Sequence, residues 1–238
     1  MMNVSKAPFD NKKVRQAMAW SIDRARFCRT TYQGLVEPSC LMVPSQSWGY
    51  FKDLEGAIGY DLDKARALLK EAGYENGFAC EIMSSANKAW ELGELAQILQ
   101  ADLKKIGVNA SVTELESARY DTRMNKGDIQ MMVHNYAWAN RDPGILVNAA
   151  KAWYTDREGG WCHFEGAEYE QLRRDVQSTM DPEKRKAIFR KLQELVLDEC
   201  FTIPVASQPM PFILASHVRN FRRSIMNQPF AGDIWLDK

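Results

Sequence analysis

The sequence has no excess of charge of either sign, because 31 lysines and arginines balance 31 aspartates and glutamates. A neutral chain has no bulk field that attracts nucleic acid or an anionic membrane, so we expect no nucleic-acid partner. The sequence also lacks an apolar run long enough to span a bilayer. Its first residues lack the basic and apolar regions of a signal peptide.

Patterns that bind metals or carry out redox chemistry are absent too. No Cys-x-x-Cys pair occurs, and the three histidines lie far apart in the sequence. These absences argue against a zinc knuckle, a thioredoxin-type site and bare nickel binding, so we expect no metal and no cofactor. The five cysteines are Cys28, Cys40, Cys80, Cys162 and Cys200. We interpret them as structural thiols, although the sequence also allows one disulfide among them.

What is present is an alternation of helical and strand patterns. Apolar spacing predicts helices over residues 11–29, 61–72, 90–106 and 117–125, the first with Asp10 as its N-cap. Asp142-Pro143 and Asp181-Pro182 predict two further helix starts, because Asp is a favoured cap and Pro a favoured first residue. Strand patterns cover residues 78–84, 108–115 and 128–136. This alternation predicts an α/β layer fold.

Two segments stand outside the alternation. Residues 34–59 combine prolines, glycines and aromatic residues, which predicts a long ordered loop. From Phe201 onward, prolines break short extended segments, so we expect no helix there and little independent core. The chain also reaches Pro8 and Phe9 without a polar leader, as a segment cut from a larger protein would.

Three patterns follow one another along the chain: PFDNKKVRQAMAWSIDR at residues 8–24, YDLDKARALLKEAGY at residues 60–74 and LQADLKKIGV at residues 99–108. Together they resemble the peptide, nickel and opine-type solute-binding proteins of ABC importers (family 5). The first resembles the stretch that opens the second lobe of that family, and the others resemble the next helix and the helix and strand after it. Family members are roughly twice as long, so the resemblance implies that this is their C-terminal lobe alone.

The resemblance implies a fold, a function and partners. The fold would be a type II periplasmic-binding-protein-like α/β lobe, a mixed sheet flanked by helices, over residues 1–200. Residues 201–238 would be an extended return segment that packs on the absent first lobe. The whole protein would be a monomer, periplasmic or tethered to the outer face of the cytoplasmic membrane. It would capture a small polar solute (a peptide, an opine or an oligosaccharide) and deliver it to ABC permease subunits.

The best candidate for the ligand site is the end of the predicted third strand. Ligands of open α/β sheets sit at the carboxyl ends of strands, and this end is followed by aromatic and amide residues. Our candidate ligand-binding residues there are Asn135, Tyr136, Trp138, Asn140 and Arg141. The alternative, equally weighted, is that Tyr136 and Trp138 only pack against the end of the sheet.

One departure from the family pattern bears on the ligand. Peptide-binding members commonly carry an acidic residue four positions before the proline of this stretch, where it pairs with the peptide amino group, but this chain has Ala139 there. Loss of a charge-assisted contact would cost a peptide on the order of 2 kcal/mol. This favours solutes without a free amine, unless Asp142 or the absent lobe compensates. We interpret Asp142 as a helix cap.

Further candidates lie at the first strand end and in the long loop. They are Ser84, Ser85, Asn87 and Trp48. The serines and the asparagine could equally serve as helix caps or loop residues, and Trp48 could equally cover a small core of its own loop. The aromatic loops around Trp153-Tyr154 and residues 159–164 could edge a cleft, although such aromatics more often anchor a loop to the body.

Two other classes of function stay open. A hydrolase or transferase could use Glu114 and Glu116 at a predicted strand end as a general acid pair, but no catalytic or nucleotide-binding motif accompanies them. We therefore expect no enzyme activity. An adaptor or chaperone-like domain could dock through the charged helix Pro182–Glu199, whose amphipathic pattern is also that of an ordinary solvated helix.

Overall fold

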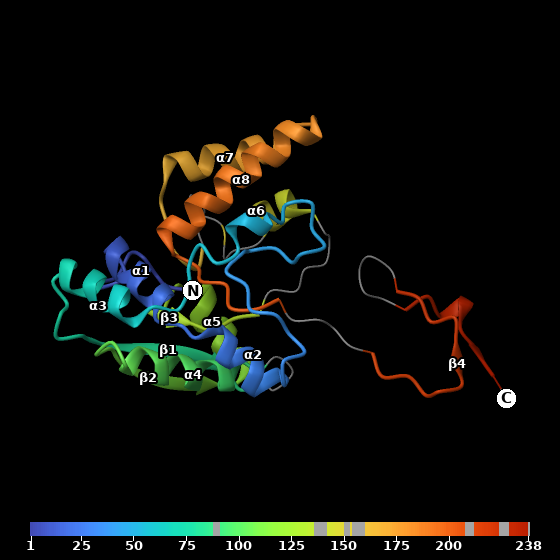
Figure 1. Ribbon diagram of the computed structural model, residues 1–238, viewed down its shortest axis with the longest axis horizontal. Helices are drawn as coiled ribbons and strands as arrows, with labels where there is room; N and C mark the ends of the chain where they lie inside the picture. Colours follow the sequence, from blue (N-terminus) through green and yellow to red (C-terminus); the bar gives the residue numbers. More distant parts are fainter. Residues whose placement is uncertain are drawn as a thin grey trace.

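The computed structural model describes residues 1–87, 91–135, 142–149, 153, 160–207, 212–223 and 229–237. Most of the chain forms one body of helices around a small sheet, and the last described segment lies away from it (Figure 1). None of the helices in these ranges is long and apolar enough to cross a membrane.

The sheet of the body has three described strands in the order β2-β1-β3, all parallel. They are β1 (Ala79–Ser85), β2 (Asn109–Leu115) and β3 (Met131–Met132), with an antiparallel bridge from Met2 to Met131 at the β3 edge. The described strands of the expected mixed sheet are therefore all parallel, and its antiparallel contact is this isolated bridge. The predicted third strand over residues 128–136 is much longer than β3, whose ladder to β1 is regular over only two residue pairs.

Alternation along the strands divides the core into two clusters. Ile82 and Met131 face one side of the sheet, with α1 (Lys12–Trp20), α3 (Leu62–Glu71) and α4 (Leu92–Lys104). Met83 and Met132 face the other side, with α5 (Ser117–Asn125), α6 (Pro143–Ala149), α7 (Ala167–Ser178) and α8 (Pro182–Glu199). Because side chains of a strand point alternately to the two faces, both faces are apolar and both are covered by helices.

The first predicted helix is in fact two helices, α1 (Lys12–Trp20) and α2 (Arg24–Tyr32). The break follows from capping. The side chain of Asp23 accepts a hydrogen bond from Arg26 N at 2.8 Å and so starts a new helix. The cap of α1 is Asn11, whose side chain accepts from Lys13 N at 2.9 Å, so the assignment of Asp10 as the cap was wrong.

Other predicted helix starts are confirmed. Asp61 caps α3 and Asp181 caps α8 (Pro182–Glu199), in each case through the backbone N–H three residues later. Helix α7 (Ala167–Ser178) packs beside α8, and together they stand above α6 and the sheet (Figure 1). Residues 34–59 form the ordered loop that the sequence predicts, with a 3-10 turn at Lys52–Leu54 and Val43 and Phe51 buried in the core.

The tail contains the short antiparallel pair β4 (Val218–Arg219) and β5 (Trp235–Leu236) and a 3-10 turn at Ala231–Asp233. Its described residues include no α-helix, as predicted. Figure 1 shows this hairpin far from the sheet and helices of the body.

All five cysteines fall within the described ranges, and each is a buried free thiol. Burial raises the pKa of the Cys80 and Cys162 thiols to about 11 and that of Cys200 to about 12. A thiol that stays protonated and is out of contact with solvent is chemically inert. The interpretation as structural thiols is therefore confirmed.

Candidate ligand-binding site

The carboxyl ends of the three strands meet at one edge of the sheet. Ser84 and Ser85 of β1 lie opposite Glu114 and Leu115 of β2. On the other side, Val133 N donates to Met83 O at 3.0 Å and so continues the β1–β3 pairing past β3. The sequence candidates at the ends of β1 and β3 are thus neighbours in space, as expected for parallel strands.

The end of β1 is built of small polar side chains. Ser84 is fully buried, and its Oγ has no hydrogen-bond partner among the described residues. Ser85 is buried too, and its Oγ accepts from Asn87 N at 3.2 Å, which is the loop role that the sequence left open. Asn87 is exposed. Ser84 thus stands out, because a buried hydroxyl without a partner is costly.

The end of β3 is an uncharged aromatic cluster. His134 is stacked on Tyr120 with ring centroids 6.1 Å apart, and the edge of Trp161 meets it at 4.9 Å. Tyr120 Oη donates to Val133 O at 2.7 Å and lies 3.1 Å from His134 Nδ1. Burial, assisted by the nearby N-terminal amine, lowers the pKa of His134 to about 4. The imidazole is therefore neutral at physiological pH.

Sequence reasoning did not find Tyr120. It lies on α5, outside any strand end, and only the packing of α5 against β1 brings its hydroxyl to the end of β3. The available signal was a tyrosine on a helix with few apolar residues, since a buried phenol needs a partner for its O–H. Asn135 follows this cluster and is half-buried.

Tyr136, Trp138, Ala139, Asn140 and Arg141 lie outside the described residues. Asp142 lies just beyond them, and its Oδ1 accepts from Gly144 N at 2.9 Å at the start of α6. Its interpretation as a helix cap is confirmed.

Trp48 lies against α8. Its ring meets Phe189 edge-on with centroids 5.6 Å apart, and the guanidinium carbon of Arg185 is 5.2 Å from the ring centre. Trp48 remains half-buried, so one part of the ring packs and another part reaches the surface. The long loop is therefore attached to α8 at this tryptophan.

The aromatic loop before α7 serves mainly as packing. Trp153, Trp161 and Phe164 are buried, and Phe164 stacks on Phe201 with centroids 4.5 Å apart. Tyr154 and Gly159, which belong to the same predicted loop pair, fall outside the described ranges. For the described members, anchoring of the loop to the body accounts for their positions.

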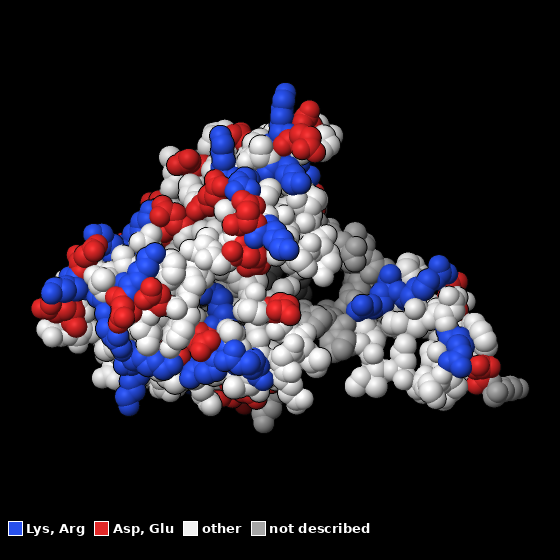
Figure 2. Space-filling model, viewed as in Figure 1, with Lys and Arg blue, Asp and Glu red and all other residues white. Residues whose placement is uncertain are grey.

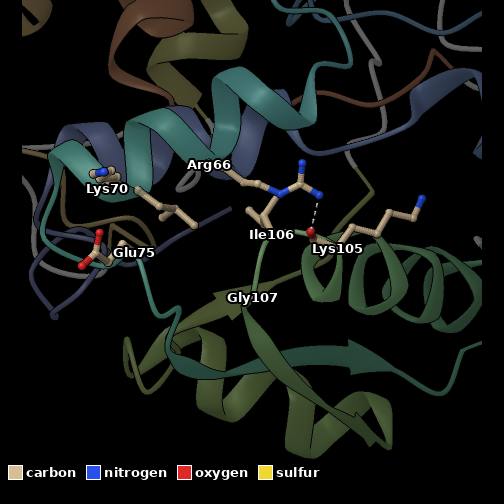
Figure 3. A pocket seen from close by; sticks show the side chains of 7 residues that line it. Arg66, Lys70, Glu75, Lys105, Ile106 and Gly107 are labelled. Carbon is tan, nitrogen blue, oxygen red and sulfur yellow. Dashed lines mark hydrogen bonds between the residues drawn. The ribbon is translucent and has the colours of Figure 1, made fainter.

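A shallow hollow lies at the opposite end of the sheet. Figure 3 shows its lining, which includes Arg66 and Lys70 of α3 and Lys105, Ile106 and Gly107 just before β2. Arg66 Nη2 donates to Lys105 O at 2.9 Å, and Lys105 Nζ is 2.8 Å from Asp102 Oδ1. Arg66 and Lys105 therefore already make contacts that stabilise the fold. The hollow lies away from the carboxyl ends of the strands.

The described residues at the strand ends form neither a metal site nor an enclosed acid pair. Among the residues that the structure describes, no group of three or more His, Cys, Asp or Glu side chains could hold a metal ion. Glu114 and Glu116 are both exposed. Figure 2 shows positive and negative side chains interspersed over the face in view, as the zero net charge predicts.

Comparisons with known proteins give a consistent result. The family model described as "Bacterial extracellular solute-binding proteins, family 5 Middle" matches residues 1–156. The chain is 29% identical over 211 residues to the dipeptide-binding protein of Escherichia coli (strain K12), covering 86% of this chain and 39% of that protein. It is 28% identical over 236 residues to heme-binding protein A of Haemophilus influenzae, covering 97% of this chain and 42% of that protein.

Among solved structures, the chain is similar to the ABC transporter-associated periplasmic binding protein DppA from Helicobacter pylori, solved in complex with the peptide STSA. The TM-score is 0.79 with 25% sequence identity, covering 86% of this chain and 40% of that one. The chain therefore spans less than half the length of the relatives it matches.

Proposed function

Because the chain belongs to the bacterial extracellular solute-binding proteins of family 5, we propose that it forms one lobe of a two-lobe solute-binding protein. The whole protein would capture a peptide or other small polar solute outside the cytoplasmic membrane and deliver it to the permease of an ABC importer. Members of this family are binding proteins and not enzymes. The expected periplasmic-binding-protein fold is confirmed by the likeness to solved binding proteins.

The observation that carries the proposal for the site is the convergence of three strand ends on a polar and aromatic edge, with the exposed carboxylate of Glu114 at the end of β2. Ser84 offers a buried hydroxyl without a partner among the described residues, and His134 is an uncharged ring beside Trp161. Ligand pockets combine apolar walls with a few oriented polar groups, and this edge has both. We propose that the solute lies against it.

The proposed ligand-binding set has the same members that the sequence suggested. It comprises Ser84, Ser85, Asn87, Trp48, Asn135, Tyr136, Trp138, Asn140 and Arg141. With alanine at position 139, the proposed ligands are solutes without a free amine, such as blocked peptides, opines or oligosaccharides. This preference rests on the sequence alone.

We also propose that the tail packs on a first lobe that is absent from this chain. The expected start at residue 201 is too early, because Phe201 is buried in the body core and Val205 O accepts from Ser39 N, so the proposal concerns residues 212–237. The tail exposes apolar side chains that a solvated hairpin does not need: Ile213 is 99% exposed, Leu236 62% and Trp235 54%. Contiguous exposed apolar surface marks an interface. Since the relatives are more than twice as long as the aligned region, their additional chain supplies a candidate for that interface.

The proposed setting follows the family. The protein would work as a monomer in the periplasm or tethered to the outer face of the cytoplasmic membrane, with the permease subunits as its membrane partner. Lobe closure would exclude water from the solute and strengthen its polar contacts.

Thermal shift of the two-lobe protein tests the proposal. The probes are the dipeptide Ala-Leu, its N-acetylated form, mannopinic acid and maltotriose. A ligand that binds only the native state raises the apparent melting temperature, so at least one probe should do so, and N-acetyl-Ala-Leu should exceed Ala-Leu. The 238-residue chain should respond to none of them, because half of the site is missing. Micromolar binding by this chain alone, or turnover of a probe, would contradict the proposal.

A further inference from the structure

A single side chain of α8 joins two regions that carry candidate ligand-binding residues. Arg185 Nη2 lies 3.0 Å from Asp142 Oδ1 and 3.1 Å from Asp142 Oδ2. Its Nε donates to Val176 O at 2.8 Å, at the end of α7. Its guanidinium carbon is 5.2 Å from the centre of the Trp48 ring. The long loop, the start of α6 and the end of α7 therefore all meet at one guanidinium.

At two positions around this contact, the backbone has no room for a residue larger than glycine. A Cβ added at Gly49, next to Trp48, would be 2.6 Å from both Phe189 Cε1 and Pro143 Cγ. A Cβ added at Gly144 would collide with Arg185 Nη2. Such separations are far below van der Waals contact, so the two glycines allow the loop, α6 and α8 to approach closely.

The ion pair is partly shielded from solvent. The side chain of Arg185 is 24% exposed and that of Asp142 is 29% exposed. A charge-assisted contact in such surroundings is stronger than one between fully exposed side chains, because water screens it less. Asp142 also caps α6, so the same carboxylate sets both the helix start and the position of the guanidinium.

We propose that Arg185 is a positioning residue of the ligand site: it holds Trp48 and the start of α6 together. The inference rests on the proposed function, because it takes Trp48 as a residue that meets the solute. Arg185 itself does not contact the solute in this proposal.

The chemistry of the contact requires arginine. A planar guanidinium can pair with a carboxylate, donate to a carbonyl and lie over an aromatic ring at the same time. A lysine in its place keeps the charge but has one compact ammonium, which cannot serve all three partners. Arg185→Lys should therefore retain part of the effect, and Arg185→Met none.

The same helix supplies a matched control. Arg190 also pairs with the long loop, through Asp53, and its guanidinium carbon is also 5.2 Å from an aromatic ring, that of Phe51. Its side chain is 36% exposed and that of Asp53 is 63% exposed. Arg190→Met thus removes a similar contact between α8 and the loop without touching Asp142 or Trp48.

The experiment uses the two-lobe protein labelled with 5-fluorotryptophan, in wild-type form and with each substitution. The fluorine resonance of Trp48 is identified by its loss in Trp48→Phe. In Arg185→Met this resonance should shift or broaden, whereas in Arg190→Met it should stay in place. An unchanged Trp48 resonance in Arg185→Met would overturn the proposal. Melting temperatures show whether each variant is folded, and Arg185→Lys provides a second variant if Arg185→Met is not.

Calorimetry with N-acetyl-Ala-Leu and Ala-Leu tests the consequence for binding. Arg185→Met should weaken binding of the better probe by about tenfold, Arg185→Lys by less, and Arg190→Met by less than about twofold. Equal effects of Arg185→Met and Arg190→Met would overturn the positioning role. If the wild type binds neither peptide, the peptide part of the proposed function fails, while the fluorine signal still decides whether Arg185 positions Trp48.

Discussion

The body (residues 1–207) buries large apolar side chains, whereas the tail (residues 212–237) exposes them. In the body, Phe9, Ile82, Tyr169 and Phe189 are all fully buried. In the tail, Ile213 is 99% exposed. Burial contributes roughly 25 cal/mol for each Å² of apolar surface, so the body has a driving force for folding that the hairpin lacks. This difference is the reason for our proposal that the tail acquires its stability from a surface outside this chain.

The largest loss of unfolding free energy is expected when a core side chain of the body is truncated. Phe189→Ala removes a ring that is fully buried and packs against Trp48 and the long loop. The cavity should cost about 3–5 kcal/mol of unfolding free energy. Urea denaturation measures it, and Phe230→Ala in the exposed tail is the control. Equal losses in the two variants would remove the distinction between body and tail.

A titration of the unfolding free energy against pH should detect the buried histidine of the body, His134. His134 has a pKa lowered to about 4 by burial, whereas an unfolded histidine titrates near 6.5. The unfolded state therefore binds a proton first as the pH falls. Stability from this group is fully present above pH 6.5 and is lost down to about pH 4, by at most about 3 kcal/mol.

His134→Gln should remove most of that pH dependence, as measured by urea unfolding at a series of pH values. If the wild type shows no loss between pH 6.5 and 4, the buried and neutral state of His134 is wrong.

An intermediate loss of stability is expected when the buried carboxylate of Asp102 is removed. It is 0% exposed and lies 2.6 Å from Arg26 Nη2, 2.8 Å from Lys105 Nζ and 3.1 Å from Asp23 N. Asp102→Asn should cost about 1–3 kcal/mol, because Arg26 and Lys105 can partly rehydrate once the charge is gone. Thermal unfolding measures it.

The control for Asp102 is Asp63→Asn. Asp63 pairs with Arg66 on α3, and its side chain is 97% exposed. Removal of such a pair should change stability by less than about 0.5 kcal/mol. A cost at Asp63 as large as that at Asp102 would mean that burial does not decide the strength of these pairs.

The smallest loss of stability is expected for a substitution at Trp235, and its size should depend on whether the first lobe is present. In the 238-residue chain, Trp235→Ala should change the unfolding free energy by no more than about 0.5 kcal/mol, because the side chain is 54% exposed. In the two-lobe protein, the same substitution should cost more than 1 kcal/mol, on the order of the value of a buried aromatic. Equal small costs in both proteins would contradict the docking of the tail on a first lobe.

Local signals predicted the elements of the body well where capping and periodicity agree. Asp61 and Asp181 mark helix starts that the structure confirms, and the limits of α5 match the prediction. The prediction failed at residues 21–23, where one apolar stripe continues across two helices. The apolar periodicity continues unchanged where the helix axis changes direction, whereas the capping residue Asp23 marks the start of the new helix.

The candidate site was predictable only in part. Parallel pairing brings Ser84 and Asn135 to one edge, which follows from the order of helices and strands. Tyr120 and Arg185 could not be found in this way, since they act through contacts from α5 and α8 that span 14 and 43 residues of sequence. Such contacts depend on how helices pack and not on any local pattern.

The sequence by itself determined the α/β alternation, the helix caps at Asp61, Asp142 and Asp181, the family and the absence of a metal-binding motif, because each depends on neighbouring residues or on composition. Only the tertiary structure decided that His134 is neutral, that Ser84 is buried without a partner among the described residues, and that one guanidinium joins Trp48 to Asp142. These properties arise from burial and from the approach of distant segments, and both are set by the packing of the whole core.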